Sequence, residues 1–147
     1  MERTCVRLES VTPENWRMAL AVSPEQEVFV ADATTLLARA YAYREDGRAV
    51  FVYVGETPVG MALYYALPDF QAYDFSQLFI DARYQGRGYG RAAARLVLDE
   101  MKADGRYRAC VLCYIEGNAA AQRLYASLGF RETGERDGNE IIMRLDW

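Results

Sequence analysis

The apolar residues between positions 47 and 81 follow the pattern of β-strands. The runs RAVFVYV, TPVGMALYYAL and FSQLFID are rich in β-branched and aromatic residues, which favours strands. The first two flank Gly55-Glu56-Thr57 and predict a hairpin. TCVRLES near the start and YRACVLCYI after residue 106 predict two more strands. The tail FRETGERDGNEIIMRLDW predicts a second hairpin that turns at Asp137-Gly138.

Helix signals lie between these runs. In TPENWRMAL, Thr12 is placed as an N-cap and Pro13 as the first helical residue, and SPEQ at 23–26 repeats the signal as a capping box. The stretch 32–43 places its apolar residues on one side, at Leu36, Leu37, Ala40 and Tyr41. Two further helices are predicted over about 88–103 and over 118–128, where Gly129 ends the second.

The predicted order is β α α β β β α β α β β, which indicates a mixed α/β (α+β) fold. A chain of 147 residues has the size of one domain. No linker-like or repeated segment divides it. Residues 1–147 are therefore expected to form a single domain.

Composition excludes several classes of function. The chain has no histidine, which excludes a Ser-His-Asp hydrolase, an HExxH zinc site and any histidine base. A net charge of −4 argues against nucleic-acid binding and favours a cationic or neutral partner. No apolar run has the roughly 18 residues that a membrane helix needs. The start does not resemble a secretory signal, so a cytoplasmic location is expected.

Cys110 and Cys113 form a CxxC pair, which can indicate zinc or redox chemistry. Here the pair lies in a predicted strand, where residues three apart face opposite sides. Only Cys5 remains as a further sulfur ligand. We therefore expect no metal site.

The segment QLFIDARYQGRGYGRAAARLVL carries the clearest chemical signal. A strand runs into glycines at 86, 88 and 90, with Arg87 and Arg91 beside them, and then into a helix. Unpaired backbone N–H groups at a helix N-terminus bind anions, and phosphate is the usual one. The dinucleotide fingerprint GxGxxG would need a glycine where Arg91 stands, and the P-loop lacks its GK[ST].

The spacing QxxGxG, present as Gln85-Gly86-Arg87-Gly88-Tyr89-Gly90, resembles the GNAT superfamily of acetyl-CoA-dependent N-acetyltransferases. EGNAAAQRLYASLGF at 116–130 is similar to the same family's helix with an asparagine, a tyrosine and a final Leu-Gly-Phe. The resemblance implies a mostly antiparallel sheet of about six to seven strands flanked by four helices. It also implies acetyl transfer from acetyl-CoA, the co-substrate, to a primary amine that attacks the thioester directly.

The resemblance also implies where the cofactor binds. The pantetheine arm would pair with the main chain of Leu78, Phe79 and Ile80, and the pyrophosphate would lie on residues 85–91. Asn118 matches an asparagine that binds the cofactor arm, although it could also be a helix N-cap. Arg123 could reach the phosphates or be a surface arginine. Packing alone is the alternative for the glycines, but it leaves the flanking arginines unexplained.

Tyr125 matches the family tyrosine that acts as general acid on the departing sulfur. Its alternative role is that of a core aromatic, since the chain has eleven tyrosines. For the base, Asp74 and Glu116 are the carboxylates expected in the cleft, acting directly or through water, and the alternative for each is an ordinary solvated acid. Asp81 is interpreted as a turn or capping residue. The oxyanion would be met by a backbone N–H near Phe79.

LAVSPEQEVFVADATTLLARAY and TGERDGNE are similar to parts of bacterial spermine/spermidine acetyltransferases. The resemblance suggests a polyamine acceptor, bound through carboxylates and cation–π contacts. Amino-acid or protein N-terminal acetylation, and a non-catalytic acyl-CoA sensor, are the alternatives; a homodimer is left open. The expected acceptor residues are Glu25, Gln26, Glu27, Asp32, Tyr64, Tyr65 and Tyr73, although helix capping also explains the acidic ones.

Overall fold

A computed structural model describes residues 5–147. Its centre is a seven-stranded sheet in the order β1-β2-β3-β4-β5-β7-β6. All neighbouring strands are antiparallel except β4 and β5, which are parallel. The strands are β1 (Val6–Ser10), β2 (Gly47–Val54), β3 (Thr57–Leu67), β4 (Ala72–Ile80), β5 (Ala109–Ile115), β6 (Arg131–Asp137) and β7 (Glu140–Asp146). The predicted fold class and strand order are confirmed, with Thr4 of the first predicted strand outside the described residues.

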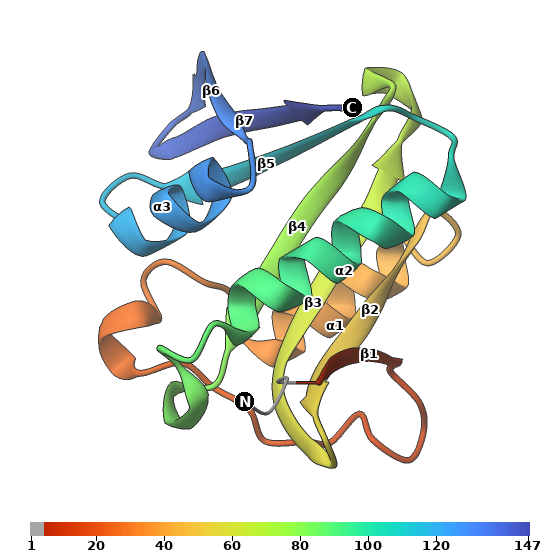
Figure 1. Ribbon diagram of the computed structural model, residues 1–147, viewed down its shortest axis with the longest axis vertical. Coiled ribbons are helices and arrows are strands. Elements are labelled where there is room, and N and C mark those ends of the chain that lie inside the picture. Colours follow the sequence, from red (N-terminus) through yellow and green to blue (C-terminus); the bar gives the residue numbers. More distant parts are fainter. Residues whose placement is uncertain (1–4) are drawn as a thin grey trace.

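Helices pack on both faces of the sheet (Figure 1). They are α1 (Ala33–Ala42), α2 (Tyr89–Asp104) and α3 (Ala119–Ser127). Helix α2 buries one face, formed by Ala93, Ala94, Val97, Leu98 and Met101. Their spacing follows the 3.6-residue helical period, so α2 shares one core with the adjacent side of β3, β4 and β5. Helix α1 covers the opposite side, at β2 and β3.

The prediction of a fourth helix is wrong for the described residues. Residues 13–17 form turns, because the side chain of Asn15 accepts from the N–H of Thr12 at 2.7 Å and donates to the carbonyl of Ser10 at 2.9 Å. Such bonds compete with helical backbone bonds. Pro24–Gln26 is one turn of 3₁₀ helix rather than α-helix. The predicted apolar side of α1 also needs a correction, since Tyr41 is 69% exposed.

Strands β4 and β5 diverge after a short parallel contact. They pair only at Tyr73 with Cys110 and at Asp74 with Val111, and then separate as β4 continues to Ile80 (Figure 1). A register shift in the β3–β4 ladder lies at Leu63/Tyr64, opposite Phe75 and Gln77, so Ser76 is the extra residue of a bulge. The far half of β4 therefore has no partner strand on its β5 side, which opens the sheet.

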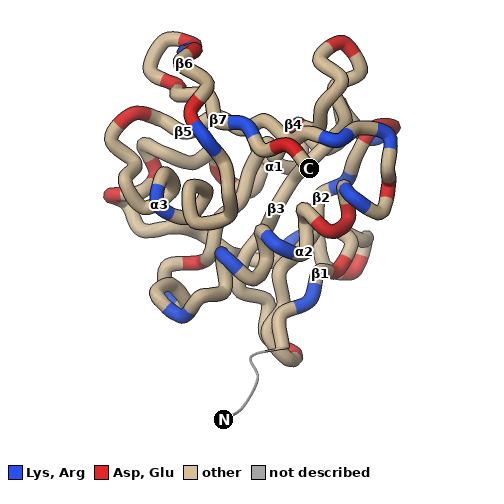
Figure 2. Tube along the Cα trace, turned by 45° about the horizontal axis from the view of Figure 1, so that its top comes forward, with Lys and Arg blue, Asp and Glu red and all other residues tan. Residues whose placement is uncertain are grey.

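Charged residues of both signs are interspersed along the chain (Figure 2). No helix among residues 5–147 is long and apolar enough to cross a membrane. Cys110 is buried and Cys113 is exposed, as alternation along β5 requires. Among these residues no group of three or more potential metal ligands gathers.

Candidate active site

A cavity of about 440 Å³ lies where β4 and β5 separate. It is bounded by the end of β4, the glycine loop, the first turn of α2, and α3. Eleven residues predicted for the cofactor or for catalysis line it: Leu78, Phe79, Ile80, Gln85, Gly86, Gly88, Tyr89, Gly90, Arg91, Asn118 and Tyr125. Residues far apart in the sequence thus meet around one space.

The glycine loop presents unbonded backbone to this cavity. Gly86 and Gly88 have φ values of 77° and 82°, which L side chains rarely adopt. The first α2 bond runs from the N–H of Ala92 to the carbonyl of Gly88 at 3.1 Å. Within residues 5–147 no protein acceptor receives a hydrogen bond from the backbone N–H groups of residues 85–91. A row of free N–H groups at a helix N-terminus is suited to bind an anion.

Arg91 lines the cavity, whereas Arg87 and Arg123 are exposed and lie outside its lining. Gly90 is close to the cavity wall, since a Cβ there would lie 3.6 Å from Cγ1 of Ile80. Of the two arginines predicted to contact the phosphates, Arg91 and not Arg87 therefore lines the cavity beside the free backbone N–H groups.

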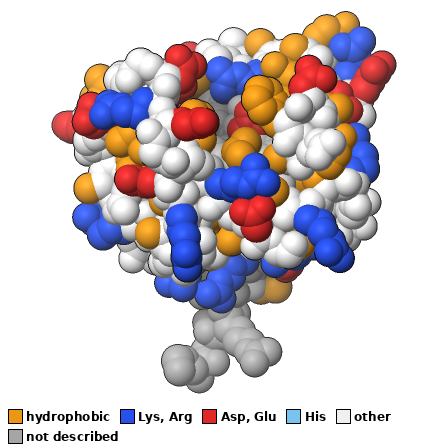
Figure 3. All heavy atoms as spheres, turned by 90° about the horizontal axis from the view of Figure 1, so that it is seen from above, with side chains coloured by type: hydrophobic (Ala, Val, Ile, Leu, Met, Phe, Trp, Pro, Cys, Tyr) orange, Lys and Arg blue, Asp and Glu red, His pale blue; other side chains and the backbone are white. Residues whose placement is uncertain are grey.

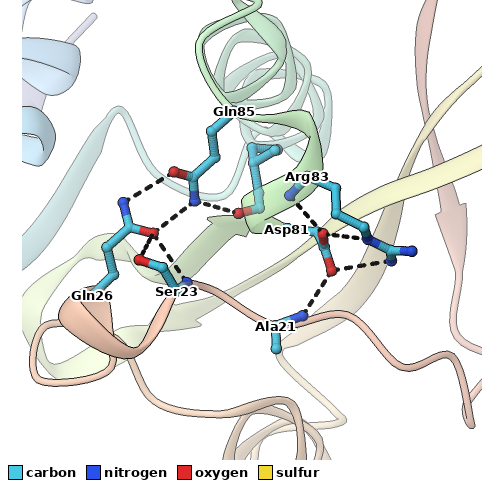
Figure 4. A network of polar contacts seen from close by, with 7 residues as sticks. Ala21, Ser23, Gln26, Asp81, Arg83 and Gln85 are labelled. Carbon is cyan, nitrogen blue, oxygen red and sulfur yellow. Dashed lines mark hydrogen bonds and ion pairs between the residues drawn. The ribbon is translucent and has the colours of Figure 1, made fainter.

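Gln85 and Gln26 bind each other (Figure 4). Nε2 of Gln85 donates to Oε1 of Gln26 at 2.9 Å and to the carbonyl of Ile80 at 2.7 Å, and Nε2 of Gln26 donates to Oε1 of Gln85 at 3.0 Å. These bonds occupy the amide groups that were predicted to contact cofactor and acceptor. The pair instead fixes the glycine loop to the segment that precedes α1.

Asp81 makes a second link between the same segments. Its carboxylate accepts from the N–H of Ala21 at 3.0 Å, from the N–H of Arg83 at 2.9 Å and from Nε of Arg83 at 2.8 Å. The Arg83 guanidinium, together with these N–H groups, lowers the pKa of Asp81 to about 2. Asp81 is thus a structural anchor, as its interpretation as a turn or capping residue predicted.

Tyr125 is buried in α3, with its ring edge-on to Phe75 and Phe130 at centroid distances of 5.9 and 5.7 Å. Burial raises the pKa of its phenol, which keeps the hydroxyl protonated at neutral pH. No protein group among residues 5–147 hydrogen-bonds to that hydroxyl. Asn118 caps α3 by accepting from the N–H of Ala121 at 3.2 Å, and it also lines the cavity.

The two predicted bases differ sharply in their surroundings. Glu116 is exposed, lies outside the cavity lining, and pairs with Nη2 of Arg136 at 2.7 Å; this pairing lowers its pKa. The expectation that Glu116 lines the cleft is therefore wrong. Burial raises the pKa of Asp74 to about 6, against smaller opposing effects of Tyr65 and Arg39. That value suits a base near neutral pH. Asp74 also lies outside the lining of the cavity, so the expectation that it lines the cleft is wrong as well.

A second cavity, of about 420 Å³, adjoins the first on the α1 side of the sheet. The two share Val22, Val30 and Phe79 as lining residues. Glu27 and Asp32 line this second cavity, whereas the exposed Glu25 lines neither. Asp32 also caps α1 by accepting from the N–H of Thr35 at 2.7 Å.

The prediction that Tyr64 and Tyr73 bind the acceptor is wrong. Both are buried on the α2 side, where their hydroxyls bind Glu100 and Asp104. Tyr65 faces the other side because neighbouring strand residues alternate. Its ring stacks on that of Tyr43 at 3.9 Å, and its hydroxyl lies 3.4 Å from Oγ of Ser76.

Residues 9–130 match the profile of the acetyltransferase (GNAT) family. The protein belongs to the GNAT family. A spermine/spermidine N(1)-acetyltransferase of Bacillus subtilis is 28% identical over 145 residues, which cover 91% of this chain and 93% of that protein. The GNAT protein is thus an acetyl-CoA-dependent N-acetyltransferase.

Solved structures share the fold of this GNAT protein. An acetyltransferase from Thermus thermophilus superposes with a TM-score of 0.76 at 22% identity, over the full length of both chains. The spermidine N-acetyltransferase of Vibrio cholerae, in complex with CoA and spermine, gives 0.75 at 16% identity, over 95% of this chain and 92% of that one.

Proposed function

We propose that this enzyme binds acetyl-CoA in the 440 Å³ cavity and transfers its acetyl group to a primary amine that enters from the α1 side. The observation that carries the proposal is the row of free N–H groups at residues 85–91, next to the unpaired end of β4. The loop would hold the pyrophosphate. The main chain of Leu78–Ile80 would hold the pantetheine arm, which leads toward Tyr125.

Each of the predicted catalytic groups then has its own step in the transfer of the acetyl group. The amine attacks the thioester carbonyl, and a β4 backbone N–H near Phe79 donates to the oxyanion that forms. Collapse breaks the carbon–sulfur bond, and the Tyr125 hydroxyl donates its proton to the departing sulfur. Asp74 accepts the proton that the ammonium must lose. Asp74 precedes Phe79 by five residues, roughly 16 Å along a strand, so the proton would have to pass through water molecules.

A polyamine such as spermidine or spermine is the acceptor that we propose. The full-length relative from Bacillus subtilis bears that activity in its name. Three carboxylates, Glu140, Asp74 and Asp137, also act on Cys113 of β5 and add to the effect of burial, which raises the pKa of its thiol to about 11. Such a group of carboxylates attracts cations.

Steady-state assay of CoA thiol release with spermidine, spermine and a neutral monoamine tests the proposal. We expect kcat/KM to be highest for the polyamines, with a preference that weakens as salt screens the carboxylates. Turnover of the monoamine alone would contradict the polyamine acceptor and leave the acetyl transfer standing. Absence of thiol release with every amine would contradict both.

A further inference from the structure

The face of the sheet beside α1 carries a guanidinium that has no ionic partner within residues 5–147. Arg39, on α1, is half-buried, and its Nη1 donates to Oγ of Ser76 at 3.1 Å. Ser76 is the bulge residue of β4, just past the point where β4 leaves β5. The charge thus lies beside the place where the two strands separate.

Six other arginines among residues 5–147 pair with a carboxylate within 4.0 Å, and Arg39 is not one of them. Its charge acts on the carboxyl of Asp74, whose pKa it lowers against the larger effect of burial. A partly buried guanidinium is unfavourable when its side-chain hydrogen-bond partner is a neutral hydroxyl, because the hydroxyl does not compensate the charge. A carboxylate is the group that its planar fork matches best.

An unpaired acceptor lies one residue further along β4. The side-chain oxygen of Gln77 is buried and has no hydrogen-bond partner among the described residues. Gln77 pairs with Leu63 across the ladder, on the α1 side. Buried polar groups normally find partners in a folded protein. Within residues 5–147, neighbouring positions of β4 thus contact a guanidinium without a carboxylate partner, at Ser76, and carry an acceptor without a donor, at Gln77.

The aromatic and charged groups around Ser76 suit a small ligand with both signs of charge. Tyr65 and the stacked Tyr43 form an aromatic wall beside Ser76, and Asp74 supplies a carboxylate on the same side of β4. Acidic and basic side chains are interspersed on the face of the molecule that Figure 3 shows. The arrangement does not select for positive charge alone.

We propose that Arg39 is a specificity-determining residue that binds the carboxylate of a zwitterionic acceptor, so that the enzyme also acetylates free amino acids. The carboxylate would lie on the Arg39 guanidinium and Ser76 hydroxyl, with the amine directed toward Gln77, Asp74 and the thioester. This inference rests on the proposed acetyl transfer but not on the polyamine acceptor.

The test compares each common L-amino acid with its own carboxamide, which keeps the amine and removes the negative charge. For wild type, kcat/KM for at least one amino acid is expected to exceed that for its amide by about 10-fold or more. In Arg39→Gln the ratio of kcat/KM for the amino acid to that for its amide should fall by about 10- to 100-fold, the range for a lost charged hydrogen bond. In Arg39→Lys the ratio should lie between the wild-type value and the Arg39→Gln value.

Arg44→Gln is the matched control, because Arg44 is exposed and its Nη1 binds the carbonyl of Tyr41; the ratio should stay at the wild-type value. Thermal melting and acetyl-CoA affinity establish that each variant is folded. The inference is overturned if spermidine is acetylated and no amino acid is, or if Arg39→Gln lowers amino acid and amide turnover equally. If no amine of any kind is acetylated, the acetyl transfer itself is contradicted instead.

Discussion

At the scale of single residues, Tyr125 is a core aromatic that we also propose as the general acid. Phe75 and Phe130 hold its ring, and its hydroxyl has no partner among the described residues. Tyr114 is also buried, but its hydroxyl donates to Glu132 at 2.6 Å. The two tyrosines thus differ in whether the hydroxyl is left for a ligand.

Tyr125→Phe removes this hydroxyl and keeps the ring. We expect kcat to fall by about 10²- to 10⁴-fold, the usual contribution of a general acid, with little change in the Kd of acetyl-CoA. Rapid-quench kinetics and calorimetry measure the two quantities. Tyr114→Phe is the control and should keep its kcat. A Tyr125→Phe enzyme with wild-type kcat, when chemistry limits turnover, would make Tyr125 a packing residue only.

Asp74→Asn tests the proposed base. The pKa of about 6 lies above the usual value, so the carboxylate form, which accepts protons, grows as pH rises through 6; wild-type kcat/KM should rise in that window. In the variant we expect the rise of kcat/KM around pH 6 to disappear and kcat/KM at neutral pH to fall by about 10²-fold or more. Asp69→Asn, at an exposed turn, should behave as wild type. An unchanged acidic limb in Asp74→Asn would exclude this base.

The same substitution should stabilise the fold at neutral pH. A carboxyl whose pKa is raised on folding adds stability below its unfolded pKa, and this contribution is lost as pH rises through the folded pKa. Asn carries no charge to bury, so the free energy of unfolding at pH 7 should increase by on the order of 1–3 kcal/mol. Urea unfolding at pH 4 and pH 7 measures it, and a variant less stable at pH 7 would contradict the burial argument.

At the scale of elements, the loop at residues 85–91 depends on local rules that the sequence already contains. Glycines at regular spacing before a helix predict free N–H groups, whatever the rest of the fold. The face of Tyr64 and Tyr73 was not predictable in this way, because β3 and β4 are buried on both sides and alternation alone does not identify the side. The roles of Arg39 and Gln77 were not predicted because they depend on the β4 bulge at Ser76 and on the contact that Arg39 makes with it.

Gly88→Asp tests the loop. The substitution places a side chain and a negative charge at a position with φ of 82°, and binding of acetyl-CoA should be lost in titration calorimetry. Gly55→Asp is the matched control: its φ is 60°, and neither glycine has an atom within 4 Å of an added Cβ. Gly55 lies in the β2–β3 turn, so its variant should lose stability and keep binding. A folded Gly88→Asp protein with wild-type affinity would place the pyrophosphate elsewhere.

At the scale of the whole molecule, the separation of β4 from β5 brings two cavities together around Val22, Val30 and Phe79. One cavity meets the glycine loop, and the other lies beside α1. Burial raises the pKa of Cys110 and Cys113, so neither thiol is prepared to carry an acetyl group. The fold therefore favours direct transfer while both substrates are bound.

The central claim is tested most directly by one reaction that contains the enzyme, acetyl-CoA and a primary amine, with spermidine as the first acceptor and an amino acid as the second. Mass spectrometry of the amine and thiol titration of CoA are read from the same sample. The account predicts equal molar amounts of N-acetylated amine and free CoA, formed only when both substrates are present. CoA release without an acetylated amine, or no release with any acceptor, would contradict it.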